Sequence, residues 1–562
     1  MDQSRTNRIT YAALAGFLTL ILLHLSWGFH FENYERVISY LISQVGEKAY
    51  RSPVLIDANF GVIVILCKVQ SLFNQVSVYS IYKLSLIYFF LVTLFYWCIK
   101  NYRLIGGIVV FCLICFVFLD SLIFVNSNKI ALLMLVSSFF IIDLKLKQKI
   151  SFGLVFLCII LSVLNRIDIS LIVISLVLLV GIIYQYKSVI KVYAYGFLAG
   201  IVGVGLFLSL VLLNVDNMKD FFTYERAIQD RKDCIIDKNP YVDRLSAEEL
   251  LIFKAGHFIM DKDHPVSYKN ASIIKHPTIF SYLFKNKELP FIYVEKLSAL
   301  RKDMIEGYGI NLFLSILSLF YICYRQYKSR ISMWKYVLAI LVYVIAPLSI
   351  NLIASIESSF FTIYLLLPFI LAIIIYTKEK KEYERKNSLF AAFLLILGTV
   401  NYVFFTYKYY QDISYNNIES SAVFDSFKKQ RELGEKKPVI ARFQEYKGFL
   451  PSRLFYNYQK VSIKYLDAGA LSHLDFFKQE FIKNFGSNYE SLSHRVNEVS
   501  KEDGYFYCSK DFMTFVQIYF AELNGVKLII EDSMPLNSYL NKYNFSLFVI
   551  KEGEEGEKQV VL

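Results

Sequence analysis

Two carboxylates follow the first apolar run of the chain, and they are the residues best placed to do chemistry. Glu32 and Glu35 lie in the segment Phe31-Glu32-Asn33-Tyr34-Glu35-Arg36. A carboxylate in such a position can act as a general base, removing a proton from a hydroxyl or an amine as a new bond forms. A purely structural alternative for Glu32 is an ion pair with Arg36, four residues later on the same helical face. We favour Glu32 as the base, with Glu35 as the second candidate.

A third carboxylate, Asp120, closes the third apolar run and precedes Asn126 and Asn128. Their oxygen atoms would suit a metal ion or an acceptor molecule, although a metal site would need more hard oxygen ligands than these. A charge at the end of an apolar run is also a common boundary marker. A further carboxylate, Glu357, precedes a late apolar run, and we expect it to line a cavity.

Basic residues offer a second kind of chemistry, the binding of an anionic phosphate. A guanidinium group forms paired hydrogen bonds to phosphate oxygens, and Arg166 lies in a turn between two apolar runs. It could instead pair with Asp168. Further candidates in a long polar segment are Lys275, Arg301 and Lys302. No HExxH, GxSxG or Gly-rich phosphate loop occurs in the sequence. No motif identifies a metal ion. A divalent cation such as Mg²⁺ or Mn²⁺ is an alternative to these basic residues for neutralising the phosphate.

The elements that must position these residues are membrane spans. The chain is 56% hydrophobic, above the roughly 45–50% of soluble proteins, and the excess is collected in apolar runs. A helix needs about 20 residues to cross a bilayer. The runs predict about eleven spans, at 9–29, 78–99, 104–120, 129–143, 151–165, 168–186, 192–214, 309–324, 334–353, 359–376 and 388–407.

Charge decides the orientation of these spans. Short loops rich in Lys and Arg alternate with loops that are poor in them, and basic loops stay in the cytoplasm. The N-terminus is therefore predicted to be cytoplasmic, and the long loops 30–77 and 215–308 and the C-terminal segment to lie outside. The net charge of +12 comes largely from the basic loops, which argues against nucleic-acid binding. The apolar segment 54–74 carries Asp57 and Lys68, so we interpret it as a helix at the membrane interface.

The last part of the chain differs in composition from the rest. Residues 408–562 alternate strand-like and helical patterns, which predicts a soluble extracytoplasmic α/β domain. The expected strands are Pro438–Phe443, Val461–Leu466, Tyr505–Cys508, Lys527–Glu531 and Ser546–Lys551. Six of the eight cysteines lie in apolar runs as small hydrophobic residues. A disulfide between Cys234 and Cys508 is open if both face an oxidising compartment. The predicted fold is thus an all-α polytopic membrane bundle (1–407) with a C-terminal α/β domain (408–562).

The order of these features resembles the C-type glycosyltransferase superfamily (GT-C fold), including the aminoarabinose transferases and protein mannosyltransferases. Four stretches carry the resemblance over roughly residues 9–407: Phe31–Arg36, Phe73–Leu84, Leu164–Asp168 and Tyr364–Pro368. There are departures. The first-loop pair is Glu32-Asn33 where the family often has Asp-Glu. Where the family's second carboxylate usually precedes the fourth span, this chain has Asn126-Ser127-Asn128, with Asp120 nearby.

The resemblance implies a function at the outer side of a bacterial inner membrane. It implies transfer of a sugar from a polyprenyl-phosphate donor to an envelope glycan, lipid or protein acceptor, with Glu32 as base. A polysaccharide polymerase of the O-antigen type uses similar donors but usually has no α/β tail. A transporter or flippase would show Gly/Pro-broken spans in corresponding halves. The acidic first loop and the tail favour the transferase over both alternatives.

Overall fold

The computed structural model describes the N-terminal third of the chain and scattered later segments. Described are residues 3–31, 35, 38–39, 42–43, 60–73, 76–102, 104–144, 148–166, 170 and 205, parts of 398–410, residue 454, and strands at 438–441, 464–467, 505–509, 528–534 and 545–552. All structural statements below concern these residues. The predicted spans from 168 to 376 and the loop 215–308 lie almost wholly outside them.

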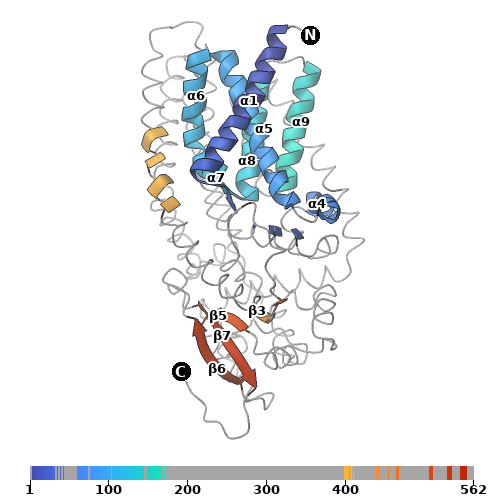
Figure 1. The fold of residues 1–562 in the computed structure, drawn as a ribbon. Coiled ribbons are helices and arrows are strands. Elements are labelled where there is room, and N and C mark those ends of the chain that lie inside the picture. Colours follow the sequence, from blue (N-terminus) through green and yellow to red (C-terminus); the bar gives the residue numbers. More distant parts are fainter. Residues whose placement is uncertain are drawn as a thin grey trace, which may run out of the picture.

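The described N-terminal region is a bundle of long helices (Figure 1). Its members are α1 (Gln3–Ser26), α5 (Val78–Asn101), α6 (Leu104–Val117), α8 (Ser127–Asp143) and α9 (Gln148–Asn165), with the short α7 (Leu119–Ile123) between α6 and α8. Helix α5 packs against α1, α6 and α8, and α8 packs against α9. The apolar runs at 9–29, 78–99, 104–120, 129–143 and 151–165 therefore form helices as predicted, with ends that shift by a few residues.

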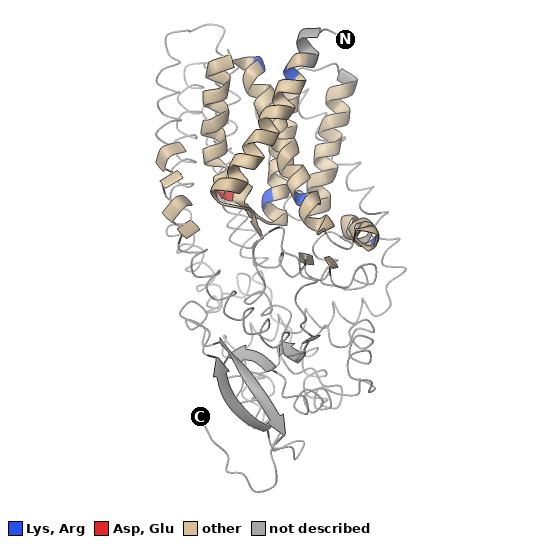
Figure 2. Ribbon diagram, viewed as in Figure 1, with Lys and Arg blue, Asp and Glu red and all other residues tan. Residues whose placement is uncertain are grey.

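Two of the described helices are long and apolar enough to cross a membrane, Asn7–Ser26 within α1 and Val78–Asn101. Shorter apolar helices are Leu104–Val117 and Ile150–Asn165. At about 1.5 Å per residue, α5 is roughly 36 Å long, whereas α6 is only about 21 Å. Figure 2 shows that the charged residues of these helices lie near the helix ends and that the middle stretches carry none. This distribution is the one that a hydrocarbon layer would require.

Helix ends are set by local chemistry. Gly28, directly after α1, has φ +73°, a conformation that an L side chain rarely adopts, and its N–H bonds to the His24 carbonyl at 2.9 Å. Glycine at this position lets the chain leave the helix at little steric cost. Helix α8 begins at the N-cap Asn126, whose side chain accepts a hydrogen bond from the Lys129 N–H at 2.8 Å. Asn126 thus caps α8, and Ser127 and Asn128 belong to its first turn rather than to the preceding loop.

Close helix contacts depend on two glycines. A Cβ on Gly16 of α1 would come within 2.8 Å of the Val92 side chain, and a Cβ on Gly107 of α6 within 3.2 Å of the Cys98 carbonyl group. Helix α5 can therefore approach both neighbours closely, as small residues allow in membrane bundles. This packing places α5 between α1 and α6, with one end directed toward the first loop.

Two short strands join segments that are far apart in the sequence. Strand β1 (His30–Phe31), just after α1, pairs in parallel with β2 (Phe124–Val125), just before α8. In register, His30 faces Phe124 and Phe31 faces Val125. We call the end of the bundle at which these strands lie the strand end. Nothing in the sequence predicted this pairing.

Helix α4 (Phe60–Leu72) has a different direction from the bundle. Figure 1 shows α4 nearly end-on at the strand end, whereas the bundle helices run roughly vertically in the plane of the picture. It lies within the segment 54–74 that was predicted to be an interfacial helix, and the crosswise direction agrees with that interpretation. Lys68 is exposed on it.

The C-terminal strands form one mixed sheet. Its order is β4 (Lys464–Asp467), β3 (Pro438–Ala441), β5 (Tyr505–Ser509), β7 (Phe545–Glu552), β6 (Leu528–Met534). Strand β3 is parallel to β4 and β5, while β7 is antiparallel to β5 and β6. All five predicted strands are present, each displaced by no more than a few residues. The helices expected between them lie outside the described residues, so the compact α/β domain stays a prediction.

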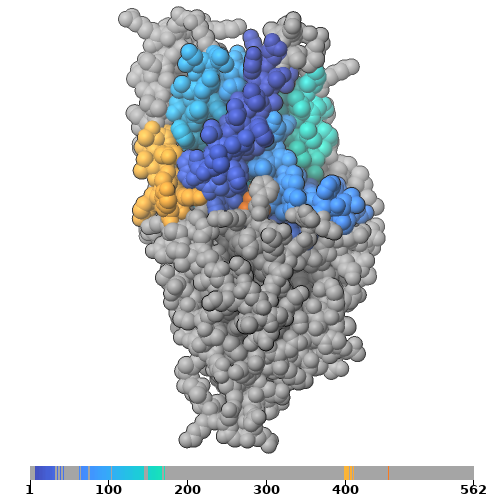
Figure 3. Space-filling model, viewed as in Figure 1, coloured from blue at the N-terminus to red at the C-terminus, as the bar shows by residue number. Residues whose placement is uncertain are grey.

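The outside of α1 is a continuous apolar surface. Figure 3 shows α1 lying across the face of the bundle, where its exposed residues include Leu14, Phe17, Leu18, Leu22 and Leu25. Soluble monomers rarely expose a patch of this kind. Contact with lipid would account for it.

The alternation of helices makes the topology testable. Tyr102 follows α5 at the end opposite the strand end, and Asn126 precedes α8 at the strand end. We expect a reporter that is active only on the outer side to be inactive when fused after Tyr102 and active when fused after Asn126. Equal activity of the two fusions would contradict the assignment of spans.

Candidate functional site

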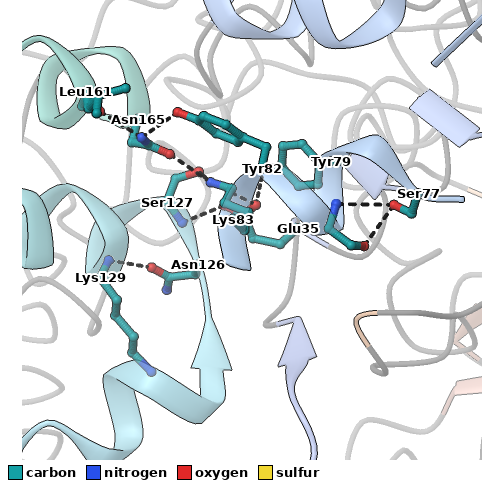
Figure 4. Close-up of polar contacts among 11 residues, drawn as sticks. Glu35, Ser77, Tyr79, Tyr82, Lys83, Asn126, Ser127, Lys129, Leu161 and Asn165 are labelled. Carbon is teal, nitrogen blue, oxygen red and sulfur yellow. Dashed lines mark hydrogen bonds and ion pairs between the residues drawn. The ribbon is translucent and has the colours of Figure 1, made fainter. Parts of the chain in front are cut away.

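The centre of the polar contacts at the strand end is the carboxylate of Glu35, which is 5% exposed. It accepts a hydrogen bond from the Ser127 N–H at 2.6 Å and one from the Tyr79 hydroxyl. Its Oε2 lies 3.5 Å from the Lys83 ammonium nitrogen. The carboxylate therefore connects the first loop to the first two turns of α5 and to the first turn of α8 (Figure 4).

Lys83 is among the largest fully buried side chains of the described part, at 1% exposure. Besides Glu35, its ammonium group donates to the Ser127 hydroxyl at 2.7 Å and to the Asn165 side-chain oxygen at 3.0 Å. An ammonium group has three donors and no acceptor, so these three acceptors account for its full capacity. The Tyr79 ring adds a cation–π contact, with its centroid 5.0 Å from the nitrogen.

Asn165 extends the contacts to the last residue of α9. Its amide nitrogen donates to the Tyr82 hydroxyl at 2.8 Å and to the Leu161 carbonyl at 2.7 Å. We call Glu35, Tyr79, Tyr82, Lys83, Ser127 and Asn165 the Glu35 network. It joins the first loop, α5, α8 and α9 at one end of the bundle (Figure 4).

The electrostatics explain why these elements meet here. A buried ion must be paired and hydrogen-bonded to be tolerated. The Ser127 N–H belongs to the first turn of α8, where unsatisfied N–H groups and the helix dipole favour a negative charge. Glu35 thus has a full positive charge on one side and a partial positive charge on the other. Charge-assisted hydrogen bonds of this kind are among the stronger ones in proteins.

A second ion pair lies beside the first. The Lys129 ammonium nitrogen is 2.8 Å from Oδ2 of Asp120, and the two side chains are 2% and 21% exposed. The Phe124 ring centroid lies 5.7 Å from the same nitrogen. Asp120 therefore connects α7 to α8 through its ion pair with Lys129, the third residue of α8.

Aromatic rings pack around β1 and β2. The Phe31 ring contacts the Tyr79 ring with centroids 5.6 Å apart, and the His30 ring lies 5.9 Å from the Tyr409 ring. His30 Nε2 is 3.1 Å from the Trp27 carbonyl oxygen, which also accepts from the Tyr409 hydroxyl. Trp and Tyr side chains gather at membrane interfaces, so this cluster is consistent with an interface at the strand end.

The predicted site residues divide into two groups. Glu35, Asp120, Asn126, Asn128 and Arg166 are described, and all five lie at or near the strand end. Asn126 and Asn128 are buried at the start of α8, and half-buried Arg166 directly follows Asn165. Outside the described residues are Glu32, Lys275, Arg301, Lys302 and Glu357, whose proposed roles stay predictions. Among the described residues, no three His, Cys, Asp or Glu side chains form a group that could hold a metal ion.

Sequence reasoning missed Lys83, the cation at the centre of the network. The signal was available, because an ionisable residue inside an apolar span is by default a functional candidate. Lys83 lies six positions into the run 78–99 and was taken only as part of a family-like stretch. Its partner Glu35 is 48 positions earlier, so no local pattern could pair them.

No protein-family model and no curated protein matches this chain.

The buried ion pair generates a stability prediction. Lys83→Met removes the only full positive charge that contacts Glu35 in the described part of the chain. Breaking a buried pair by removing one partner costs about 3–5 kcal/mol. We expect a clearly lower thermal unfolding midpoint of the purified protein in detergent and faster proteolysis of it.

The matched control is Lys68→Met, because Lys68 is an exposed lysine on α4. Its removal should leave the midpoint within about 1 °C, since exposed charges contribute little. An equal midpoint for Lys83→Met and the wild-type chain would contradict the paired arrangement.

Proposed function

We propose that this chain is a polytopic membrane glycosyltransferase that moves a sugar from a polyprenyl-phosphate donor to an envelope glycan, lipid or protein acceptor on the outer side of a membrane. About eleven spans and an extracytoplasmic α/β domain complete the proposed architecture. A bacterial inner membrane is the proposed location.

One observation carries the proposal furthest. The first loop after α1 is joined to the segment before α8 by the β1–β2 pairing and by the Glu35–Ser127 hydrogen bond. The resembled family has its acidic residues at these two places, although this chain has Asn126-Ser127-Asn128 at the second. A reaction centre assembled from both requires them to be adjacent, and their adjacency supports the proposal. The apolar helices and the exposed apolar face of α1 support the membrane setting.

The proposed reaction has one bond formed and one broken. The acceptor oxygen or nitrogen bonds to the anomeric carbon of the sugar, and the bond from that carbon to the phosphate oxygen breaks. The acceptor proton passes to the Glu32 carboxylate, and polyprenyl phosphate departs with the electron pair. Its charge would be neutralised by cations. Arg166 lies at the strand end beside Asn165 and is the described candidate for this role.

The contacts of Glu35 argue against it as the base and leave Glu32 as the first-loop candidate. A base needs a lone pair free to take the acceptor proton, and the Glu35 carboxylate is buried beneath Tyr79, Lys83 and Ser127. Asp120 is in a comparable position, bound to Lys129. Glu32 directly follows β1 in the sequence, one residue beyond the pairing with β2.

The decisive experiment measures transfer by the full-length protein in lipid nanodiscs. We expect the wild-type chain to release polyprenyl phosphate from at least one member of a panel of polyprenyl-phosphate sugars. Glu32→Gln, which keeps size but cannot take a proton, should lower turnover by about 10²–10⁴-fold and leave the donor KM nearly unchanged.

The control for loop charge is Glu47→Gln, which removes one carboxylate from the same predicted loop and should retain wild-type turnover. Full activity of Glu32→Gln would show that another group is the base. A wild-type chain that consumes no donor, together with unchanged envelope glycans on gene deletion, would remove the transferase proposal.

A further inference from the structure

The first loop is held to the bundle at two points that bracket a short stretch of chain. Backbone pairing holds His30 and Phe31 against β2, and the carboxylate of Glu35 holds the chain against α5 and α8. Residues 32–34 connect the two points. The proposed base is therefore the residue next to one anchor and three positions from the other.

The two anchors differ in strength. The β1–β2 pair is only two residues long, and a short ladder contributes little independent stability. The Glu35 carboxylate has three donors of charged or polar character, from Tyr79, Lys83 and Ser127. Each lies on a helix of the rigid bundle, so the position of the carboxylate is defined from two helices at once.

We propose that Glu35 is a positioning residue, whose pairing with Lys83 and the first turn of α8 fixes the loop that carries the catalytic carboxylate Glu32. This inference rests on the proposed transferase function. Glu35 itself takes no proton from the acceptor; it supplies charge and geometry. A displacement of about 1 Å of a catalytic group can lower the rate by about 10²-fold, so the loss of this anchor is expected to lower turnover.

A double-variant experiment separates positioning from chemistry. Glu35→Gln leaves the Lys83 ammonium group buried without its carboxylate partner. Lys83→Met leaves the Glu35 carboxylate buried without its ammonium partner. Replacing both removes the two charges together, which buried pairs tolerate far better than the loss of one. The glutamine amide oxygen can still accept the Ser127 N–H. Both single variants should lose at least tenfold in kcat at unchanged donor KM, and the double variant should return to within about tenfold of the wild-type chain.

The opposite result is equally clear. If Glu35 were the base, the double variant would fold and still turn over about 10²–10⁴-fold more slowly. A second readout is the pH profile of kcat/KM for Glu35→Asp, which keeps the charge and shortens the side chain. The acid limb should stay where it is in the wild-type chain, because it belongs to Glu32. A shifted limb would assign the titrating group to Glu35 and overturn the proposal.

A third measurement needs neither activity nor purified substrate. His30 and Phe124 are paired across β1 and β2, so a chain carrying both His30→Cys and Phe124→Cys should form a disulfide under mild oxidation of membranes. Mass spectrometry of the linked peptides gives the yield. Glu35→Gln should reduce the yield several-fold, adding Lys83→Met should restore it, and the Glu47→Gln control should not change it.

These measurements distinguish a failure of the proposed transferase function from a failure of the positioning role of Glu35. A wild-type chain without transfer activity would overturn the proposed function and with it the role of Glu35 in catalysis. An equal crosslink yield in the Glu35→Gln chain and in the wild-type chain, both with Lys83 intact, would show that the pairing of Glu35 with Lys83 does not hold the loop. That result would overturn the inference even if the chain is an active transferase.

Discussion

The Glu35 carboxylate lies in an apolar bundle end where an unpaired charge would be unstable. Its position therefore depends on donors arriving from several directions: the Lys83 ammonium, the Tyr79 hydroxyl and the Ser127 N–H. Because these groups belong to α5 and α8, satisfying one carboxylate sets how two helices and the first loop meet. Asn165 of α9 joins through Lys83. The arrangement at the strand end follows largely from this single requirement for charge balance.

The same requirement limits what the described residues can do chemically. A buried carboxylate surrounded by donors is suited to hold structure and poorly suited to exchange protons with a substrate. The second pair, Asp120 with Lys129, follows the same logic at the junction of α7 and α8. Two acidic residues that looked reactive from their positions in the sequence are therefore engaged with lysines. Glu32, the first-loop carboxylate that the sequence favours, stays the proposed base.

Apolar length and periodicity predicted the described helices and strands well, because burial in lipid or in a sheet leaves a local mark on the sequence. The helices at the first five predicted spans, helix α4 within the segment 54–74 and all five C-terminal strands could be placed in this way. The cap at Asn126 was not predicted, although Asn is a favoured residue just before a helix. Long-range partners were not predicted either. The pairing of Lys83 with Glu35 and of β1 with β2 joins residues 48 and 94 positions apart, and nothing local distinguishes the correct partner. The resemblance named both segments, but it gave no indication of the contacts that join them.

The long sequence separation between Glu35 and its donor in α8 has a consequence for how the chain is made. The Ser127 N–H that Glu35 accepts lies 92 residues downstream. At a synthesis rate of about 5–20 residues per second, it leaves the ribosome roughly 5–20 s after Glu35. During that interval α1 has already been synthesised. Once α5 has emerged, the Glu35 carboxylate can contact only Lys83 and Tyr79 of its three donors. The first loop therefore acquires its final contacts only after the first turn of α8 has been made, and until then the Glu35 carboxylate lacks one of its three donors. Synthesis of α5, whose Lys83 lies about one and a half turns from the helix start, supplies the first full positive charge to that carboxylate.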